Sequence, residues 1–146
     1  MKIDAAGLDA GLRREALGEM LSRHGINPTR QRLDIAQALF SPAEHLSADQ
    51  LLMRVNGRRP EVSKATVYNT LRAFVEKKLV REVIVDPGRV FYDPNTEPHH
   101  HFYNIGTGEL TDIDAGKIRI SALPGLPRGM VTEGVDVIVR IRSRTA

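Results

Sequence analysis

The hydrophobic positions between residues 62 and 80 recur at helical spacing and predict an amphipathic helix. Ser63 precedes this helix and can cap it by accepting a hydrogen bond from a backbone N–H group of the first turn. Val62 before the cap and Val67 after it match the two positions of a hydrophobic staple. The predicted apolar stripe consists of Val67, Leu71, Phe74 and Val75.

Three more helices are predicted on the N-terminal side of this one. Gly25 is placed to end the first of them, and Thr29 can cap the second. Ser47 and Gln50 match a capping box, which predicts the start of the third. These helices are expected at about residues 9–24, 29–40 and 47–55.

Two short strands follow the helices and predict a hairpin. Residues 81–85 and 89–93 flank Pro87 and Gly88, where proline sets the backbone of one turn position and glycine supplies the positive φ of the next. Helices followed by a hairpin are the winged-helix arrangement, a relative of the helix-turn-helix. Arg89 would then stand beside the hairpin tip, where a cation can enter a DNA minor groove.

Residues 94–98 contain two prolines and predict a hinge, because X-Pro bonds favour extended chain. Short strands are expected beyond it, and this part is small enough to need a partner surface, which favours a homodimer. The predicted fold class is α+β. An N-terminal winged-helix DNA-binding domain (1–93) precedes the hinge, and a small α/β dimerisation and metal- or haem-sensing domain (99–146) follows it. Its strands are expected at 99–104, 109–113 and 134–142.

Composition narrows the class of protein. The chain has 146 residues, 41% of them hydrophobic, and no cysteine, which excludes disulfides and any Cys-ligated zinc. No run approaches the roughly 20 apolar residues of a membrane span, so a soluble cytoplasmic protein is expected. Residues 1–85 hold 14 Lys and Arg against 10 Asp and Glu, a net +4, whereas residues 86–146 hold 7 against 8, a net −1. This uneven charge favours a nucleic-acid-binding first half.

The polar side of the 62–80 helix carries the candidate DNA contacts. Cations, a phenol and an amide on an exposed helix suit phosphate oxygens and base edges of a major groove. A solvated surface is the alternative interpretation of this face. The candidate residues are Lys64, Thr66, Tyr68, Asn69 and Arg72 on the helix, Arg89 on the hairpin, and Arg30 and Arg32 as phosphate contacts.

Consecutive histidines provide candidate metal ligands. His99 and His101 share one face of their predicted strand, and His100 faces the other way. If the turn is centred on residues 106–107, Asp112 lies opposite His101 and Asp114 opposite His99, close enough for two imidazoles and a carboxylate to meet at a cation. Nitrogen and oxygen ligands without thiolate suit Fe²⁺, Mn²⁺ or Zn²⁺. A polar surface strand that happens to contain three histidines is the alternative.

Several motifs, in order and at matching separations, resemble the ferric uptake regulator family of metalloregulators. The resemblance spans about residues 20–115, and within the family the chain is most similar to the iron response regulator branch. The motifs are GINPTRQRLDIAQALF, EHLSADQL, KATVYNTLRAFVEKKLV and PHHHFYNIGTGELTDID.

The resemblance implies a homodimeric, iron-responsive DNA-binding repressor or activator that reads an inverted repeat in double-stranded DNA. It implies one divalent ion, Fe²⁺, Mn²⁺ or Zn²⁺, near the hinge. Haem is the alternative effector, with contacts from His99, His100 and His101. Asn104 and Thr107 stand where the family's structural zinc site has cysteines, so that zinc is expected to be absent. The implied metal ligands are His45, Asp93, His99, His101 and Asp112.

A metalloenzyme is the rival interpretation, because two histidines and one carboxylate also form the facial triad of non-haem iron oxygenases. The basic helical half of the chain and the additional ligand His45 favour a regulator, so no enzymatic activity is expected.

Overall fold

The computed structural model describes residues 6–40, 44–57 and 62–145, with side chains from residue 13 onward. The chain forms two compact units, unit 1 (Met1–Thr96) and unit 2 (Glu97–Ala146). Their boundary lies within the stretch 94–98 that the sequence predicts as a hinge. Among the described residues, no helix is both long and apolar enough to cross a membrane.

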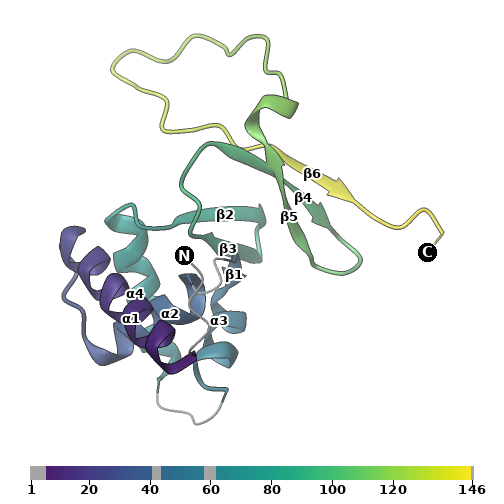
Figure 1. Cartoon of the computed structure of the whole chain (residues 1–146). Helices are drawn as coiled ribbons and strands as arrows, with labels where there is room; N and C mark the ends of the chain where they lie inside the picture. The colour runs from purple at the N-terminus through teal and green to yellow at the C-terminus, as the bar shows by residue number, and fades with distance from the viewer. Residues whose placement is uncertain (1–5, 41–43, 58–61, 146) are drawn as a thin grey trace. The chain divides into compact units, whose positions relative to one another are not determined.

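The described residues of unit 1 form four helices and a small sheet (Figure 1). The sheet has the strand order β1-β3-β2, and both strand pairs are antiparallel. The four helices followed by the β2–β3 hairpin give the predicted winged helix. Its elements are α1 (Ala6–Arg23), α2 (Arg30–Phe40), β1 (Leu46–Ser47), α3 (Ala48–Val55), α4 (Lys64–Glu76), β2 (Arg81–Asp86) and β3 (Arg89–Asp93).

The helix starts follow the predicted caps. The capping box of α3 is complete, since Ser47 Oγ accepts from Gln50 N–H at 3.2 Å and Gln50 Oε1 accepts from Ser47 N–H at 2.9 Å. Ser63 Oγ accepts from Thr66 N–H at 3.1 Å at the start of α4. Thr29 Oγ1 accepts from the third N–H of its helix, at 3.3 Å. These bonds satisfy N–H groups that have no partner within their own helices.

Helix α4 ends in a Schellman motif built on a lysine. Lys78 has φ 61°, a left-handed conformation that glycine usually supplies. Its N–H donates to Val75 O at 3.0 Å, and Leu79 N–H donates to Phe74 O at 2.9 Å. The α1 helix ends in the same conformation at Gly25, with φ 75°, as predicted.

The predicted stripe of α4 is at the centre of the core of unit 1. Val67, Leu71 and Phe74 are completely buried, and Val75 packs partly buried against them. Facing side chains from the other three helices complete this core. They include Leu17 and Leu21 of α1, Ile35, Ala36 and Leu39 of α2, and Leu51 of α3.

The turn of the wing differs from the prediction. Gly88 does not have a positive φ, so the turn does not use the conformation expected from Pro87-Gly88. Asp86 Oδ1 instead accepts from Gly88 N–H at 2.9 Å, and the strand register shifts between Ile84 and Asp86. The aspartate side chain thus closes the turn by bonding to the backbone two residues on, which removes the need for a left-handed glycine.

Unit 2 contains a three-stranded sheet with the order β5-β4-β6. Strands β4 and β5 are antiparallel and β6 is parallel to β4. The element after β5 is a single 3₁₀ turn, and the chain then runs through residues 118–137 without a helix or strand (Figure 1). The elements are β4 (His99–Asn104), β5 (Leu110–Asp114), η1 (Ala115–Lys117) and β6 (Ile138–Ile141).

The last strand is shorter than the predicted span 134–142. Its pairing with β4 begins at His101↔Ile138. Val137 N–H donates to the ring of His100 at 3.0 Å rather than to a ladder carbonyl, so regular pairing cannot extend further back. The second strand also starts one residue later than predicted, at Leu110.

Asn104 organises the turn between β4 and β5. Its Oδ1 accepts from the backbone N–H groups of Gly106 and Thr107 at 2.9 and 3.0 Å. The backbone carbonyl of Asn104 accepts from Gly108 N–H at 2.7 Å, and Gly108 has a φ of 79°. Asn104, at a position where the resemblance implies a zinc-binding cysteine in other members of the family, therefore belongs to a turn closed by hydrogen bonds.

Candidate functional site

The strongest candidate site lies on one face of the sheet of unit 2. Cross-strand pairing places His101 opposite Asp112 and His99 opposite Asp114, the predicted register. His99 Nε2 lies 3.6 Å from Asp112 Oδ1, and His101 Nε2 lies 3.4 Å from the same oxygen. One carboxylate oxygen therefore faces both imidazoles.

The backbone orients the first imidazole. His99 Nδ1 lies 2.6 Å from the carbonyl oxygen of Glu97, which can only accept a hydrogen bond. Nδ1 therefore carries a proton, and in the neutral ring Nε2 keeps a lone pair directed toward Asp112. The rings of His99 and His101 meet edge to face, with centroids 4.6 Å apart. Both histidines are buried, so their orientations are held by packing.

This donor set fits a divalent cation. One ligand atom from each of His99, His101 and Asp112 lies within 4.8 Å of the others. Two ligands bound at about 2.1 Å in a tetrahedral site lie about 3.4 Å apart, close to the nitrogen–oxygen separations found here. A histidine whose second nitrogen donates to a carbonyl is the usual arrangement around a protein-bound metal. Two nitrogens and one oxygen suit Fe²⁺, Mn²⁺ or Zn²⁺.

His100 has a different role in the sheet. It pairs with Ile113 and faces away from His99 and His101, as predicted. Its Nδ1 accepts the N–H of Val137, which joins β4 to the chain entering β6. In the neutral ring the proton must then lie on Nε2.

The other two predicted ligands belong to unit 1. Leu46 of β1 pairs with Tyr92 of β3 in an antiparallel arrangement. His45 precedes Leu46 and Asp93 follows Tyr92, so both lie at the same end of the β1–β3 pair. Asp93 is buried, and its Oδ1 accepts from Asn95 N–H at 2.9 Å. His45 is half-buried and meets Phe91 edge to face at 6.4 Å. Each unit thus brings its own predicted ligands together.

The predicted DNA-binding face of α4 is exposed. Lys64, Tyr68 and Arg72 lie along one line of the helix, and Tyr68 keeps 40% of its surface accessible. Lys64 Nζ lies 5.9 Å from the Tyr68 ring centre and 4.0 Å from Asp49 Oδ1. Asn69 is exposed beside them.

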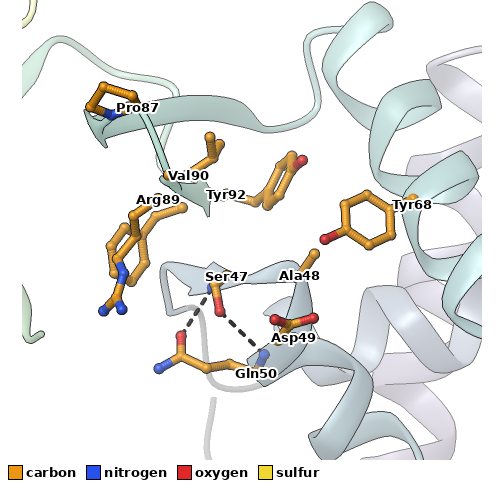
Figure 2. A pocket seen from close by; sticks show the side chains of 11 residues that line it. Ser47, Ala48, Asp49, Gln50, Tyr68, Pro87, Arg89, Val90 and Tyr92 are labelled. Atoms are coloured by element: carbon orange, nitrogen blue, oxygen red, sulfur yellow. Dashed lines mark hydrogen bonds between the residues drawn. The ribbon is translucent and has the colours of Figure 1, made fainter.

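A cavity of about 470 Å³ lies between α4, the start of α3 and the wing. Figure 2 shows Tyr68 reaching from α4 toward the start of α3, with Arg89 and Tyr92 on the wing side. Asp49 and Tyr92 do not stand out in the sequence, because only the fold brings them beside Tyr68. Burial raises the pKa of Tyr92, and the nearby Glu82 and Tyr68 raise it further, while Arg72 lowers it.

Two predicted DNA contacts are engaged within the protein. Arg32 Nη1 donates to Asn27 O at 2.9 Å, next to the turn before α2. Thr66 Oγ1 accepts from Ser63 Oγ at 2.9 Å and so belongs to the cap of α4. The side chains of Arg30 and Arg89 are exposed.

A winged helix with an exposed basic helix, followed by a small sheet with a His–His–Asp cluster, is typical of a two-domain metal-responsive DNA-binding regulator. Residues 23–123 match the model of the Ferric uptake regulator family. The chain belongs to this family, whose members are transcription regulators and not enzymes, which excludes the metalloenzyme alternative. Members of the family bind DNA as dimers and bind divalent metal ions.

Individual relatives agree with this assignment. The peroxide operon regulator of Bacillus subtilis (strain 168) is 35% identical over 100 residues, 68% of each chain. The peroxide-responsive repressor PerR of Staphylococcus epidermidis is 32% identical over 93 residues, which cover 64% of this chain but only 62% of that relative.

A solved structure agrees with the fold. The ferric uptake regulator from Pseudomonas aeruginosa with manganese matches with a TM-score of 0.65 at 23% identity, covering 87% of this chain and 97% of that one. This likeness confirms the predicted α+β class.

Proposed function

We propose that the chain is an iron-responsive transcriptional regulator of the iron response regulator type, whose DNA affinity is set by a divalent ion. The observation that carries the proposal is the convergence of His99 Nε2 and His101 Nε2 on one oxygen of Asp112, in a unit joined to a winged helix. When bound, the ion supplies the positive charge and the coordinate bonds that hold these ligands together.

His45 and Asp93 are proposed to complete the ligand set. They share one end of the β1–β3 pair, and Asp93 is followed by His99 after only five residues, 94–98. That connection spans at most about 20 Å, which limits how far Asp93 of unit 1 can lie from His99 of unit 2. An ion held by both units would restrict how the winged helix moves relative to the dimer.

Regulation then follows from preferential binding of the ion to one arrangement of the units, since a ligand shifts an equilibrium only through its different affinities for the two states. The homodimer is proposed to read an inverted repeat, with recognition helices separated by about 34 Å or a multiple of it. The proposed DNA contacts are Lys64, Thr66, Tyr68, Asn69, Arg72 and Arg89, with Arg30 and Arg32 at phosphates.

Haem is the alternative effector, held by His99, His100 and His101. The site geometry supports an ion better, because His100 Nδ1 is used by Val137 N–H and the other two rings face a carboxylate.

A peroxide-responsive repressor is the second candidate function. It is favoured by the names of the Bacillus and Staphylococcus relatives, which describe peroxide responses. The same ligand set would serve either function, so the two candidates differ in the signal that releases the DNA.

The test is footprinting on genomic fragments with protein that is metal-free or loaded with Mn²⁺, Fe²⁺, Zn²⁺ or haem, each with and without hydrogen peroxide. Protection of an inverted repeat that depends on the ion, and not on haem, is expected. His99→Ala with His101→Ala should remove the ion response, His45→Ala should leave ion binding but uncouple it from DNA affinity, and the exposed control His24→Ala should behave like the parent. No sequence-specific protection in any state would refute the proposal, and release by peroxide at constant iron would select the second candidate.

A further inference from the structure

A long apolar segment of unit 2 is exposed in the single chain. Residues 119–136, here called the C-terminal arm, are all exposed, and they join η1 to β6 as a wide loop (Figure 1). Val131 keeps 85% of its surface accessible. Six large apolar side chains exposed within one segment are typical of an interaction surface rather than of scattered exposed residues. Its large apolar residues are Ile120, Leu123, Leu126, Met130, Val131 and Val135.

The arm cannot bury these side chains by folding into a helix. Pro124 and Pro127 lack backbone N–H groups, and Gly125 between them disfavours a helix. The two prolines also restrict the backbone, so the arm loses less conformational entropy when it docks in an extended form.

The sheet of unit 2 presents a matching apolar face. Phe102 pairs with Val139, and Asn104 pairs with Ile141, so Phe102, Val139 and Ile141 share one side of the sheet. All three remain more than one-third exposed. His99 and His101 lie on the opposite side, so covering this face leaves the candidate metal site free.

Unit 2 is short of buried apolar side chains. Among its described residues, the buried hydrophobic ones are Tyr103, Leu110 and Ile113, fewer than those the arm exposes. A unit of about 50 residues with so small a core needs a metal or a partner subunit to be stable. Residues 97–146 carry six Lys and Arg and six Asp and Glu, a net charge of zero, so two copies do not repel one another. Zero net charge also disfavours a strongly charged partner such as nucleic acid.

We propose that the C-terminal arm of one copy packs on the Phe102–Val139–Ile141 face of a second copy, and that the two arms are exchanged symmetrically. Such an interface is isologous, as expected for a two-fold dimer. The 18 residues of the arm and the three sheet residues approach the roughly 20–30 residues per side of a standard interface. This inference rests on the proposed homodimer and assigns the surface that forms it.

The first experiment compares two substitutions of exposed apolar residues by sedimentation equilibrium. Val131→Glu alters the arm, whereas Met53→Glu alters α3 of unit 1, where 77% of the side chain is accessible. Neither residue is buried in the single chain, so both variants should fold. Val131→Glu is expected to raise the dimer dissociation constant about tenfold or more, and Met53→Glu to leave it unchanged. An unchanged constant for Val131→Glu would overturn the proposal.

The second experiment uses the absence of natural cysteines. Chains carrying Leu126→Cys are mixed with chains carrying Val139→Cys, and a short bifunctional maleimide is added. A cross-link between chains is expected, and it should disappear when Val131→Glu is added to the arm. A second sample contains one chain type with both Leu126→Cys and Val139→Cys. If that sample cross-links only within a chain, and the mixture of single variants does not cross-link, the arm covers its own sheet and the proposal is overturned. Footprinting of the parent distinguishes failure of this inference from failure of the proposed function. Ion-dependent operator binding by a dimer whose arms are not exchanged would refute this inference and leave the proposed function intact.

Discussion

Asp112 Oδ1 lies 3.4 Å from His101 Nε2, a separation typical of two ligands of one ion and longer than a hydrogen bond. The same oxygen faces His99, so both imidazoles share this carboxylate. The chemistry of the cluster therefore depends on the charge of Asp112.

Replacing that charge should weaken metal binding. Asp112→Asn keeps the shape of the side chain but offers a neutral amide, and we expect at least about a 100-fold loss of Mn²⁺ affinity by calorimetric titration, more than the 10–100-fold typical of outer-shell partners. Asp114→Asn is the matched control, because Asp114 lies opposite His99 in the ladder and is exposed. Equal affinities for Asp112→Asn and the parent would move the site elsewhere.

The exposed line of α4 should contribute to operator affinity. Tyr68→Ala and Arg72→Ala are each expected to weaken specific binding by about 1–3 kcal/mol, the usual cost of a lost base contact, while leaving the dimer intact. Titration of a labelled operator at fixed salt measures the loss, and Met53→Ala provides an exposed control outside this face. If both α4 variants bind like the parent, another element reads the DNA.

The cysteine-free turn of unit 2 should not depend on a metal. Prolonged chelation is expected to strip the regulatory ion and to lower DNA affinity, while the dimer and its fold persist, unlike a domain that folds around zinc. Asn104→Ala, which removes an acceptor shared by two backbone N–H groups, should instead lower the free energy of unfolding by about 1 kcal/mol. Thr111→Ala on the exposed side of β5 serves as its control. Dissociation of the parent dimer by chelator would reveal a structural ion.

Lys78 should be replaceable by glycine with a gain in stability. A left-handed conformation costs an L-residue about 1–2 kcal/mol, and the extra flexibility of unfolded glycine offsets roughly 0.5–1 kcal/mol of this, so Lys78→Gly is expected to gain about 0.5 kcal/mol. Lys77→Gly should have the opposite sign, because Lys77 has φ −88°. Urea denaturation measures both, and a loss of stability in Lys78→Gly would contradict the assignment of strain.

Alkaline pH should destabilise unit 1 through Tyr92. Burial, Glu82 and Tyr68 raise its pKa above the ordinary value of 10.0 in the folded state. The unfolded chain then loses this proton first, so the stability contribution is present below about pH 10 and is lost as pH rises further. Tyr92→Phe is expected to flatten that part of the profile of unfolding free energy against pH. Parallel profiles for parent and variant above pH 10 would rule this cause out.

The parts of the site that follow from local periodicity could be predicted from the sequence. Once the turn is centred on residues 106–107, the two-residue period of a strand pairs His101 with Asp112 without further information. The caps at Ser47 and Ser63 are equally local, since each bond spans three residues. These features depend on neighbours along the chain and not on the tertiary fold.

The features that the sequence did not predict depend on competing or distant contacts. The turn after β2 uses the side chain of Asp86 where a left-handed Gly88 was expected, because an aspartate can replace the backbone bond. The late start of β6 depends on His100 taking the N–H of Val137, a partner 37 positions away. Tyr92 joins the surroundings of Tyr68 only after the wing has packed near α4.

The parallel pairing of β6 with β4 has a consequence for how the protein assembles. Strand β6 reaches β4 only after residues 115–137 have closed a loop. The chain loses the conformational entropy of this loop before any hydrogen bond between β4 and β6 forms. Helices α2 to α4 are joined by short connections, and contacts near in sequence form fastest. Unit 1 is therefore expected to form early, and β6 to dock last and to open first. In native-state hydrogen exchange, the amides of residues 138–141 should exchange well before those of α4. Unit 1 would then be folded before the sheet of unit 2 is complete.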